Sequence, residues 1–417
     1  MTNSKKILYA LVATGMFCVF STGQDLRAQT TSTPYSIFGI GEIDSGNYGE
    51  NSGMGGIGIG FRQINMLNPL NPAANASILP KTFIFDGSFY GKLAYYRGQG
   101  KTANTGNGNI QRLAIGFRAA RPWVITAGIL PFSSVGYDIR TTSSVEGSEG
   151  GETFETSFTG SGGLNKVFIG QTLSITSKLS VGVNASLIFG RVTHGEYTPY
   201  WNIQKRSRGE KVHFDFGLQY TDMLSADTRM TVGLVGSYGT DMKMYNSRLS
   251  YDYEGNVAVN DVLTSTKEYI PAFFGAGVSF SHRNKIAFGL DYRFQQWSKG
   301  EISSATIRYK DMHKLSAGFS FIPNIYNARN YFQLIKYQIG FMVNDSYLDV
   351  NGKNTTNYAA TGGMVFPMRN NNSLHLGLEY GKNGGFAGGR NAIREDYFKV
   401  TVGFSFSEAW FVRFKYN

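Results

Sequence analysis

Few side chains in this sequence are spaced so that they could carry out catalysis. His213 and Asp215 stand two residues apart, as a base and its orienting carboxylate would. In a flat strand their ring and carboxylate would be separated by about two strand rises, or about 7 Å. No spacing of metal ligands joins the other histidines, which are His194, His282, His313 and His375. We therefore expect no enzyme, no metal site and no other cofactor.

Two further patterns have a chemical interpretation. Acidic residues recur at every third position of one polar segment, at Glu146, Glu149, Glu152 and Glu155. Such a run could bind divalent cations that bridge lipopolysaccharide, but a solvated loop explains it more simply. Residues 53–58, Gly-Met-Gly-Gly-Ile-Gly, match the dinucleotide-binding fingerprint in form. No strand-helix-strand unit surrounds them, so we reject a nucleotide site.

The dominant pattern from residue 82 onward is an alternation of apolar and polar residues. It is clearest at residues 179–193, where the apolar positions are Leu179, Val181, Val183, Ala185, Leu187 and Phe189. Units of about ten such residues, each ended by turn residues, recur about fourteen times, as in a transmembrane barrel. The pattern predicts an all-β, antiparallel transmembrane barrel of about 14 strands over residues 82–417. A soluble sandwich with one buried face would alternate in the same way.

The N-terminus argues for export. Lys5 and Lys6 precede an apolar run over residues 7–20, and a polar stretch ends at Ala28. This order predicts a signal peptide over residues 1–28, whose apolar run is too short to span a bilayer. Cys18, the only cysteine, lies within it, so we expect a mature protein without thiols or disulfides. No later apolar segment has the length of a spanning helix, so an exported integral protein of this sequence must be a barrel in the cell outer membrane.

Link lengths and charge agree with that location. Tight links near 121–122, 177–178 and 281–284 alternate with longer polar segments such as 194–211 and 242–268. The formal charge of +11 becomes +9 when Lys5, Lys6, Arg27 and Asp25 are removed with the signal. The basic residues are scattered rather than gathered on one helix, which argues against nucleic acid. We expect them to meet lipopolysaccharide and other outer-membrane lipids, or to line the lumen.

Residues 29–81 do not have the pattern of barrel strands. Glycine, asparagine and proline interrupt every run, as in Asn71-Pro72-Ala73. Apolar residues nevertheless recur within the segment, at Ile37, Phe38, Met54, Ile57, Ile59, Phe61, Met66 and Leu67. A solvated tail has no use for such residues. We therefore predict that residues 29–81 form an N-terminal plug, or hatch, inside the barrel.

The whole mature chain resembles the FadL family of outer-membrane transporters for long-chain fatty acids and other hydrophobic compounds. The resemblance rests on a plug containing Asn71, Pro72 and Ala73, on the number of strands, and on segments 130–137, 160–166 and 291–298. It implies a barrel closed by a hatch, loaded from outside with an apolar ligand that leaves sideways through a gap in the wall. The outer loops lack a long apolar helix, which departs from the better-known members. A branch of the family that includes PorV serves as a partner in protein secretion.

The residues supply a candidate for the lateral gap. Pro131 falls inside the third predicted strand, ahead of Phe132 and Ser133. Proline cannot donate to a β-ladder, so it marks a bulge or a break. In lipid, unpaired backbone groups cost several kcal/mol each, so a break needs a plug or a functional gap beside it. A harmless bulge at the rim is the alternative.

These features predict an outer-membrane transporter that passes fatty acids or other hydrophobic small molecules through a plugged barrel with lateral release. The main alternative is a non-transporting partner or scaffold of a protein secretion or outer-membrane assembly machine. A general porin ranks third, because a plug would block its wet lumen.

Overall fold

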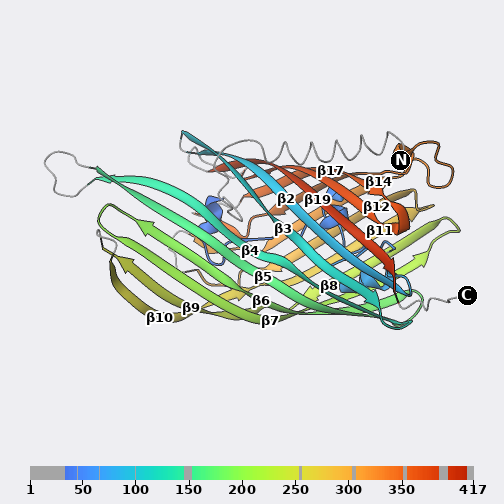
Figure 1. The fold of residues 1–417 in the computed structure, drawn as a ribbon, viewed down its shortest axis with the longest axis horizontal. Coiled ribbons are helices and arrows are strands. Elements are labelled where there is room, and N and C mark those ends of the chain that lie inside the picture. Colours follow the sequence, from blue (N-terminus) through green and yellow to red (C-terminus); the bar gives the residue numbers. More distant parts are fainter. Residues whose placement is uncertain are drawn as a thin grey trace, which may run out of the picture.

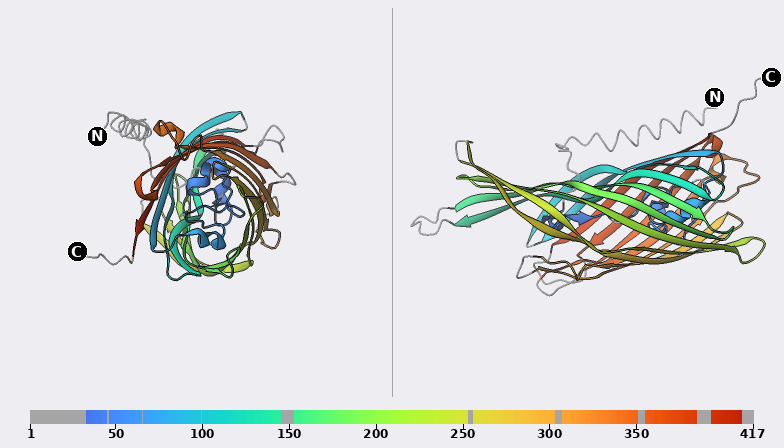
Figure 2. Two further views of the ribbon diagram at one scale, coloured as in Figure 1. Left: turned by 90° about the vertical axis from the view of Figure 1, so that its right-hand side faces the viewer. Right: turned by 90° about the horizontal axis from the view of Figure 1, so that it is seen from below.

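The chain folds into a closed barrel that surrounds its own N-terminal segment (Figures 1 and 2). A computed structural model describes residues 33–410, apart from Ser45, Asn65, Gln99 and the segments 145–152, 253–255, 303–306, 351–354 and 385–392. The predicted signal peptide and Glu146, Glu149 and Glu152 therefore lie outside the described residues. No described helix is long and apolar enough to cross a membrane.

Antiparallel strands build the wall. In chain order they are β2 (Thr82–Gly98), β3 (Lys101–Arg118), β4 (Trp123–Ser144), β5 (Thr153–Ser174), β6 (Leu179–Tyr197), β7 (Asn202–Met223), β8 (Thr228–Ser237), β9 (Thr240–Tyr251), β10 (Val257–Ile270), β11 (Ala272–His282), β12 (Ile286–Gln296), β14 (Met312–Phe321), β15 (Lys336–Asp345), β17 (Thr356–Pro367), β18 (Ser373–Asn383) and β19 (Arg394–Ala409). Pairing of β19 with β2 closes the ring.

We call each full-length position in the wall a stave, whether one strand or two consecutive strands fill it. Two staves are interrupted. β7 pairs with β8 along Asp215–Met223 and with β9 along Asn202–Gly209, so β8 and β9 form one stave. β10 and β11 form another, interrupted at Pro271, which lacks a backbone donor. The sixteen labelled wall strands therefore make fourteen staves, and the predicted 14-stranded antiparallel barrel is confirmed.

The alternation in the sequence separates the lipid face from the lumen. On β6, Leu187 is 42% exposed on the outer surface, whereas Ser186 and Asn184 are buried toward the interior. The staves differ in length: β4, β5 and β7 have 22 residues each, but β14 and β15 have 10. A bilayer crossing takes about 9–11 residues, so one side of the wall extends well beyond the membrane (Figure 1).

The described residues between 33 and 81, here called the lumenal segment, lie inside the ring of strands (Figure 2, blue). They form the short helices η1 (Pro34–Ile37), η2 (Gly49–Met54) and η3 (Pro72–Ser77) and the strand β1 (Glu42–Ile43). A small two-stranded antiparallel sheet of β13 (Ile307–Tyr309) and β16 (Leu348–Val350) lies outside the wall ladder. Two further short helices, η4 (Tyr331–Gln333) and η5 (Arg369–Asn371), lie in links between staves.

The orientation in the membrane can be tested with single cysteines. Tyr200 is 58% exposed in the link between the long strands β6 and β7, and Ser225 is exposed in the tight link between β7 and β8. Long strands and loops face outward in such barrels. Hence Tyr200→Cys should react with an impermeant maleimide on intact cells, and Ser225→Cys only after permeabilisation. The opposite labelling would reverse the orientation.

Candidate functional site: the filled lumen and its side opening

Glycines in the wall seat the lumenal segment. A Cβ built on Gly233 would lie 1.9 Å from the Ile59 carbonyl oxygen, and one on Gly340 would lie 2.2 Å from the Gly55 nitrogen. The side chain of any other residue would collide with this backbone. Six wall glycines approach the backbone of the segment in this way: Gly182, Gly233, Gly277, Gly318, Gly340 and Gly363. Gly217, Gly289 and Gly377 stand equally close to its side chains. We call all of these residues together the glycine belt.

The belt runs across neighbouring staves from β6 to β18. Gly217 is the register partner of Gly182, and Gly277 is the partner of Gly233. Gly318 is paired with both Gly289 and Gly340. The lumen is therefore lined at one level by backbone rather than side chains, and the segment packs directly against it.

Buried polar side chains of the wall also form hydrogen bonds with the backbone of the segment. The Asp291 carboxylate accepts hydrogen bonds from the backbone N–H groups of Gly58, Ile59 and Gly60 at 2.6, 2.8 and 3.3 Å. Arg293 donates to the Gly56 carbonyl oxygen at 2.8 Å. Asp291 and Arg293 thus satisfy four backbone groups of residues 56–60, a stretch with no regular secondary structure.

One buried and one partly buried ion pair hold other parts of the segment. Arg112 pairs with Asp86 on the neighbouring strand and donates to the Leu67 carbonyl oxygen at 3.2 Å. Lys336 on β15 contacts the Glu50 carboxylate at 2.5 Å. Burial opposes ionisation of Glu50, but the Lys336 ammonium outweighs it and lowers the pKa of that carboxyl.

The predicted hatch motif packs against three staves. The Asn71 side chain caps η3 by accepting from Ala73 N–H at 3.0 Å, and it donates to the carbonyl oxygens of Ile59 and Leu218. Thr172 on β5 donates to the Pro72 carbonyl oxygen at 2.6 Å. Asn71, Pro72 and Ala73 thus fix the segment to the wall, and their role as a hatch remains a prediction.

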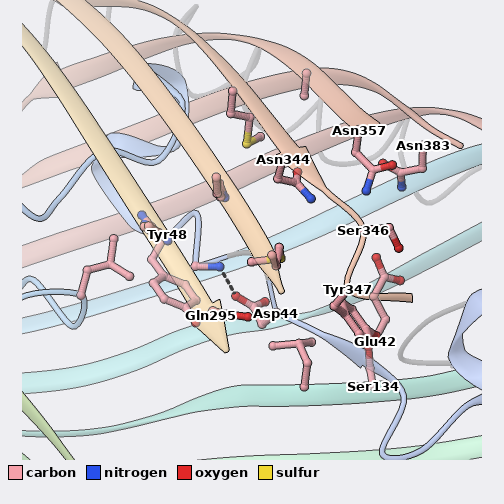
Figure 3. A pocket seen from close by; sticks show the side chains of 18 of the residues that line it. Glu42, Asp44, Tyr48, Ser134, Gln295, Asn344, Ser346, Tyr347, Asn357 and Asn383 are labelled. Carbon is pink, nitrogen blue, oxygen red and sulfur yellow. Dashed lines mark hydrogen bonds between the residues drawn. The ribbon is translucent and has the colours of Figure 1, made fainter. Parts of the chain in front are cut away.

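A cavity of about 330 Å³ lies between the lumenal segment and the outer rim (Figure 3). Every stave contributes to its lining, and Asp44, Tyr48 and Leu70 of the segment lie against it. Its walls carry many ionisable groups for so small a space: Glu42, Asp44, Lys92, Lys166, Asp215, Arg293, Lys314, Glu379 and Lys399. The cavity can therefore offer hydrogen bonds and charge to a ligand, not only apolar contact.

One expectation about these groups was wrong. His213 Nε2 lies 3.4 Å from Asp215 Oδ1, and not about 7 Å away, because the two side chains on the same strand face lean toward each other. Asp215 also contacts Lys166 Nζ at 2.5 Å. The Asp215 carboxylate therefore contacts both the Lys166 ammonium and the His213 imidazole.

The wall opens between β3 and β4. Their ladder runs from Arg118↔Val124 to Leu113↔Ile129, and no further pair joins the two strands among the described residues. Register shifts flank this point, at Gln111 on β3 and at Phe132 on β4. The cavity reaches the opening, since Asn107 of β3 and Leu130 and Ser134 of β4 line it.

Strand β1 of the lumenal segment occupies the edge that β3 leaves free. Glu42 pairs with Ser134 and Ile43 pairs with Ser133. Because the other edge of β4 at Ser134 is paired with Gly163 of β5, β1 must lie on the β3 side. Further hydrogen bonds along this edge join Asp44 N–H to the Phe132 carbonyl oxygen and the Ser133 hydroxyl to the Ile40 carbonyl oxygen.

The structure brings Pro131, Phe132 and Ser133 together at this opening. Pro131 is paired with Asn165 of β5, Phe132 is the extra residue of the bulge, and Ser133 is paired with β1. Their part in a lateral exit remains a prediction. The roles of Asp291, Arg112 and Lys336 were not predicted, although each is a charged residue at an inward position of a barrel strand, which the sequence pattern indicates.

Comparison with known proteins identifies the family. A family model described as BamG matches residues 4–417. The chain belongs to the BamG family. No curated protein matches the sequence.

Solved structures share the fold at low sequence identity. The Pseudomonas putida toluene transporter TodX is 14% identical with a TM-score of 0.58, covering 87% of this chain and 98% of that one. The CymD monoaromatic hydrocarbon channel is 14% identical with a TM-score of 0.55, covering 90% and 99%. A Pseudomonas aeruginosa FadL homologue is 12% identical with a TM-score of 0.51, covering 89% and 98%.

The predicted resemblance to the FadL family is therefore confirmed for the fold, and the PorV-like branch stays a prediction. With an apolar outer face and fourteen staves, this BamG-family chain is an integral barrel of the outer membrane of a Gram-negative bacterium.

The glycine belt can be tested within one strand. Gly233→Ala should unseat the segment, because its Cβ would lie 1.9 Å from backbone. Overpacking of this kind costs about 1–3 kcal/mol. We expect a lower heat-modification temperature and higher single-channel conductance in planar bilayers. Gly236→Ala on the same strand has no atom nearer than 3.6 Å and is the matched control. Equal behaviour of the two variants would contradict the belt.

The Asp291 contacts predict a second effect. Asp291→Asn replaces one acceptor oxygen with an amide nitrogen that faces backbone N–H groups, leaving at least one of them unsatisfied at a cost of about 1–3 kcal/mol. Limited proteolysis should then cut the segment near Gly58 sooner. Asp227→Asn makes the same change in an exposed ion pair with Arg283 and should leave the cleavage rate unaltered. An unchanged rate in Asp291→Asn would show that these hydrogen bonds do not hold the segment.

Proposed function

We propose that this protein passes a hydrophobic or amphipathic small molecule from outside into the bilayer through the opening between β3 and β4. The observation that carries the proposal is that Asn107, Leu130 and Ser134, which flank the opening, also line the central cavity. A ligand in the cavity could therefore leave past β1 alone, without crossing the part of the lumenal segment that packs on the glycine belt. The similar fold of a toluene transporter and of a monoaromatic hydrocarbon channel lends support.

The cavity favours an amphiphile over a plain hydrocarbon. Its volume of about 330 Å³ is at the lower end for ligand pockets, which span roughly 300–1,000 Å³. Lys92, Lys314 and Lys399 line it, and a hydrocarbon would cover such groups without replacing their hydrogen bonds. A long-chain fatty acid could place its carboxylate here and its chain along the opening. We therefore favour fatty acids among the candidate ligands.

Strand β1 is the element that would move aside to open this route, and we call it the door. Only two residue pairs join it to β4, so displacing it breaks few ladder contacts. The partly buried side chain of Ile43 packs with Phe132 on a small apolar cluster that a passing chain could replace. Lateral release would then exchange one apolar contact for another at little cost.

A scaffold role in a secretion or outer-membrane assembly machine is the second candidate. The observation that favours it is the glycine belt, which packs the segment against nine staves and leaves the lumen rigid. Transport along the barrel axis would have to break all of these contacts, whereas a scaffold would depend on them.

Locking the door tests the transport proposal. The pair Glu42→Cys and Ser134→Cys joins register partners of an antiparallel ladder, whose Cα separation suits a disulfide. Oxidation should slow uptake of a fluorescent long-chain fatty acid by at least about tenfold, which corresponds to about 1.4 kcal/mol of added barrier. Reduction should restore uptake.

The matched control is Ile115→Cys with Ala127→Cys, which links β3 to β4 where their ladder is already intact. Its oxidation should leave uptake unchanged. Uptake that continues through the oxidised Glu42/Ser134 pair would exclude this route. No uptake in the unaltered protein would remove the transport proposal and leave the scaffold.

A further inference from the structure

Cationic side chains gather on the outer face of β6, β7 and β9. Arg191 is the register partner of Arg208, which is in turn the partner of Tyr245. Lys243 lies two residues from Tyr245 on the same strand face, with its ammonium 4.9 Å from the centre of the tyrosine ring. These four residues, all exposed, are here called the outer basic patch.

The patch lies at a defined depth. On β6 the outward positions are apolar from Leu179 to Phe189, and the next outward residue is Arg191. Ten strand rises at the usual tilt give an apolar band about 25 Å tall, which matches the hydrocarbon belt of outer-membrane barrels. Arg191 therefore stands where the acyl chains end and the headgroups of the outer leaflet begin.

The basic residues of the patch outnumber the carboxylates beside them, which are Glu210 on β7 and Asp241 on β9. Like charges directly opposite each other in a ladder are destabilising, and Arg191 and Arg208 are opposite. Among the described residues, no carboxylate forms an ion pair with Arg191, Arg208 or Lys243. Glu210, on the same face of β7, makes no ion pair with any of them. An anion from the membrane is left to balance the patch.

We propose that the outer basic patch binds a phosphate group of lipopolysaccharide. Two guanidinium groups on neighbouring strands can grip one phosphate with planar, paired hydrogen bonds, which an ammonium cannot provide alone. Lys243 adds a third positive charge, and Tyr245 presents an amphipathic ring at the interface, where such rings favourably lie. The inference does not depend on transport, because the patch faces the lipid and not the lumen.

The test compares lipids that differ only in phosphate. Native mass spectrometry of the full chain in mild detergent, titrated with phosphorylated lipid A, should show binding. The variant Arg191→Gln with Arg208→Gln should bind this lipid at least about tenfold more weakly. Dephosphorylated lipid A should bind both proteins weakly and equally.

Arg121→Gln with Arg329→Gln removes the same charge from exposed sites in two links between staves and should bind lipid A as the unaltered protein does. Equal binding of both forms of lipid A to the unaltered protein would overturn the proposal. So would full binding by the folded Arg191/Arg208 variant. Equal affinity for phosphatidylglycerol would show a general site for anionic headgroups and overturn the assignment to lipopolysaccharide.

Discussion

Close approach of two backbones is the constraint on which the rest of this structure depends. The lumenal segment has almost no regular secondary structure, so its N–H and C=O groups must find partners in the wall. These hydrogen bonds can form only if the backbone of the segment lies close to the backbone of the wall. At Gly233 and Gly340 even a methyl group would stand in the way. The belt glycines lie on neighbouring staves, several of them as direct register partners, and together they support the segment.

The remaining features of the interior follow from this packing of the segment against the glycine belt. Once the backbone of residues 58–60 lies against the wall, the carboxylate of Asp291 can reach all three N–H groups. The segment then fills the lumen on one side and leaves on the other a cavity lined by both charged and apolar side chains. Its early residues extend to the wall, where β1 pairs with the edge of β4 that β3 does not cover. The free edge of β4 is thus paired by a strand from the same chain.

The sequence predicted the elements better than their contacts. Alternation on strands such as residues 179–193 is a local property, so the number of staves and the start of the first one at Thr82 followed from it. Pro131 marked the bulge because a missing donor is visible in sequence. The belt could not be predicted in the same way, since a glycine on a strand does not reveal what lies opposite. The His213–Asp215 contact was missed because side-chain lean is set by neighbours such as Lys166 and not by spacing.

A rigid seat and a lateral route are compatible because they use different parts of the lumenal segment. Residues 52–73 contact the glycine belt, whereas β1 pairs with β4, packs on an apolar cluster and lines the cavity. Movement of β1 would cost two ladder pairs, the apolar contact of Ile43 and the neighbouring hydrogen bonds of Asp44 and Ile40, while the belt would stay in place. A segment anchored along most of its length and free to move at one short strand is what a side door requires. The same anchoring would hold a scaffold rigid. How firmly the segment packs on the glycine belt therefore does not distinguish the two functions, whereas the mobility of β1 does.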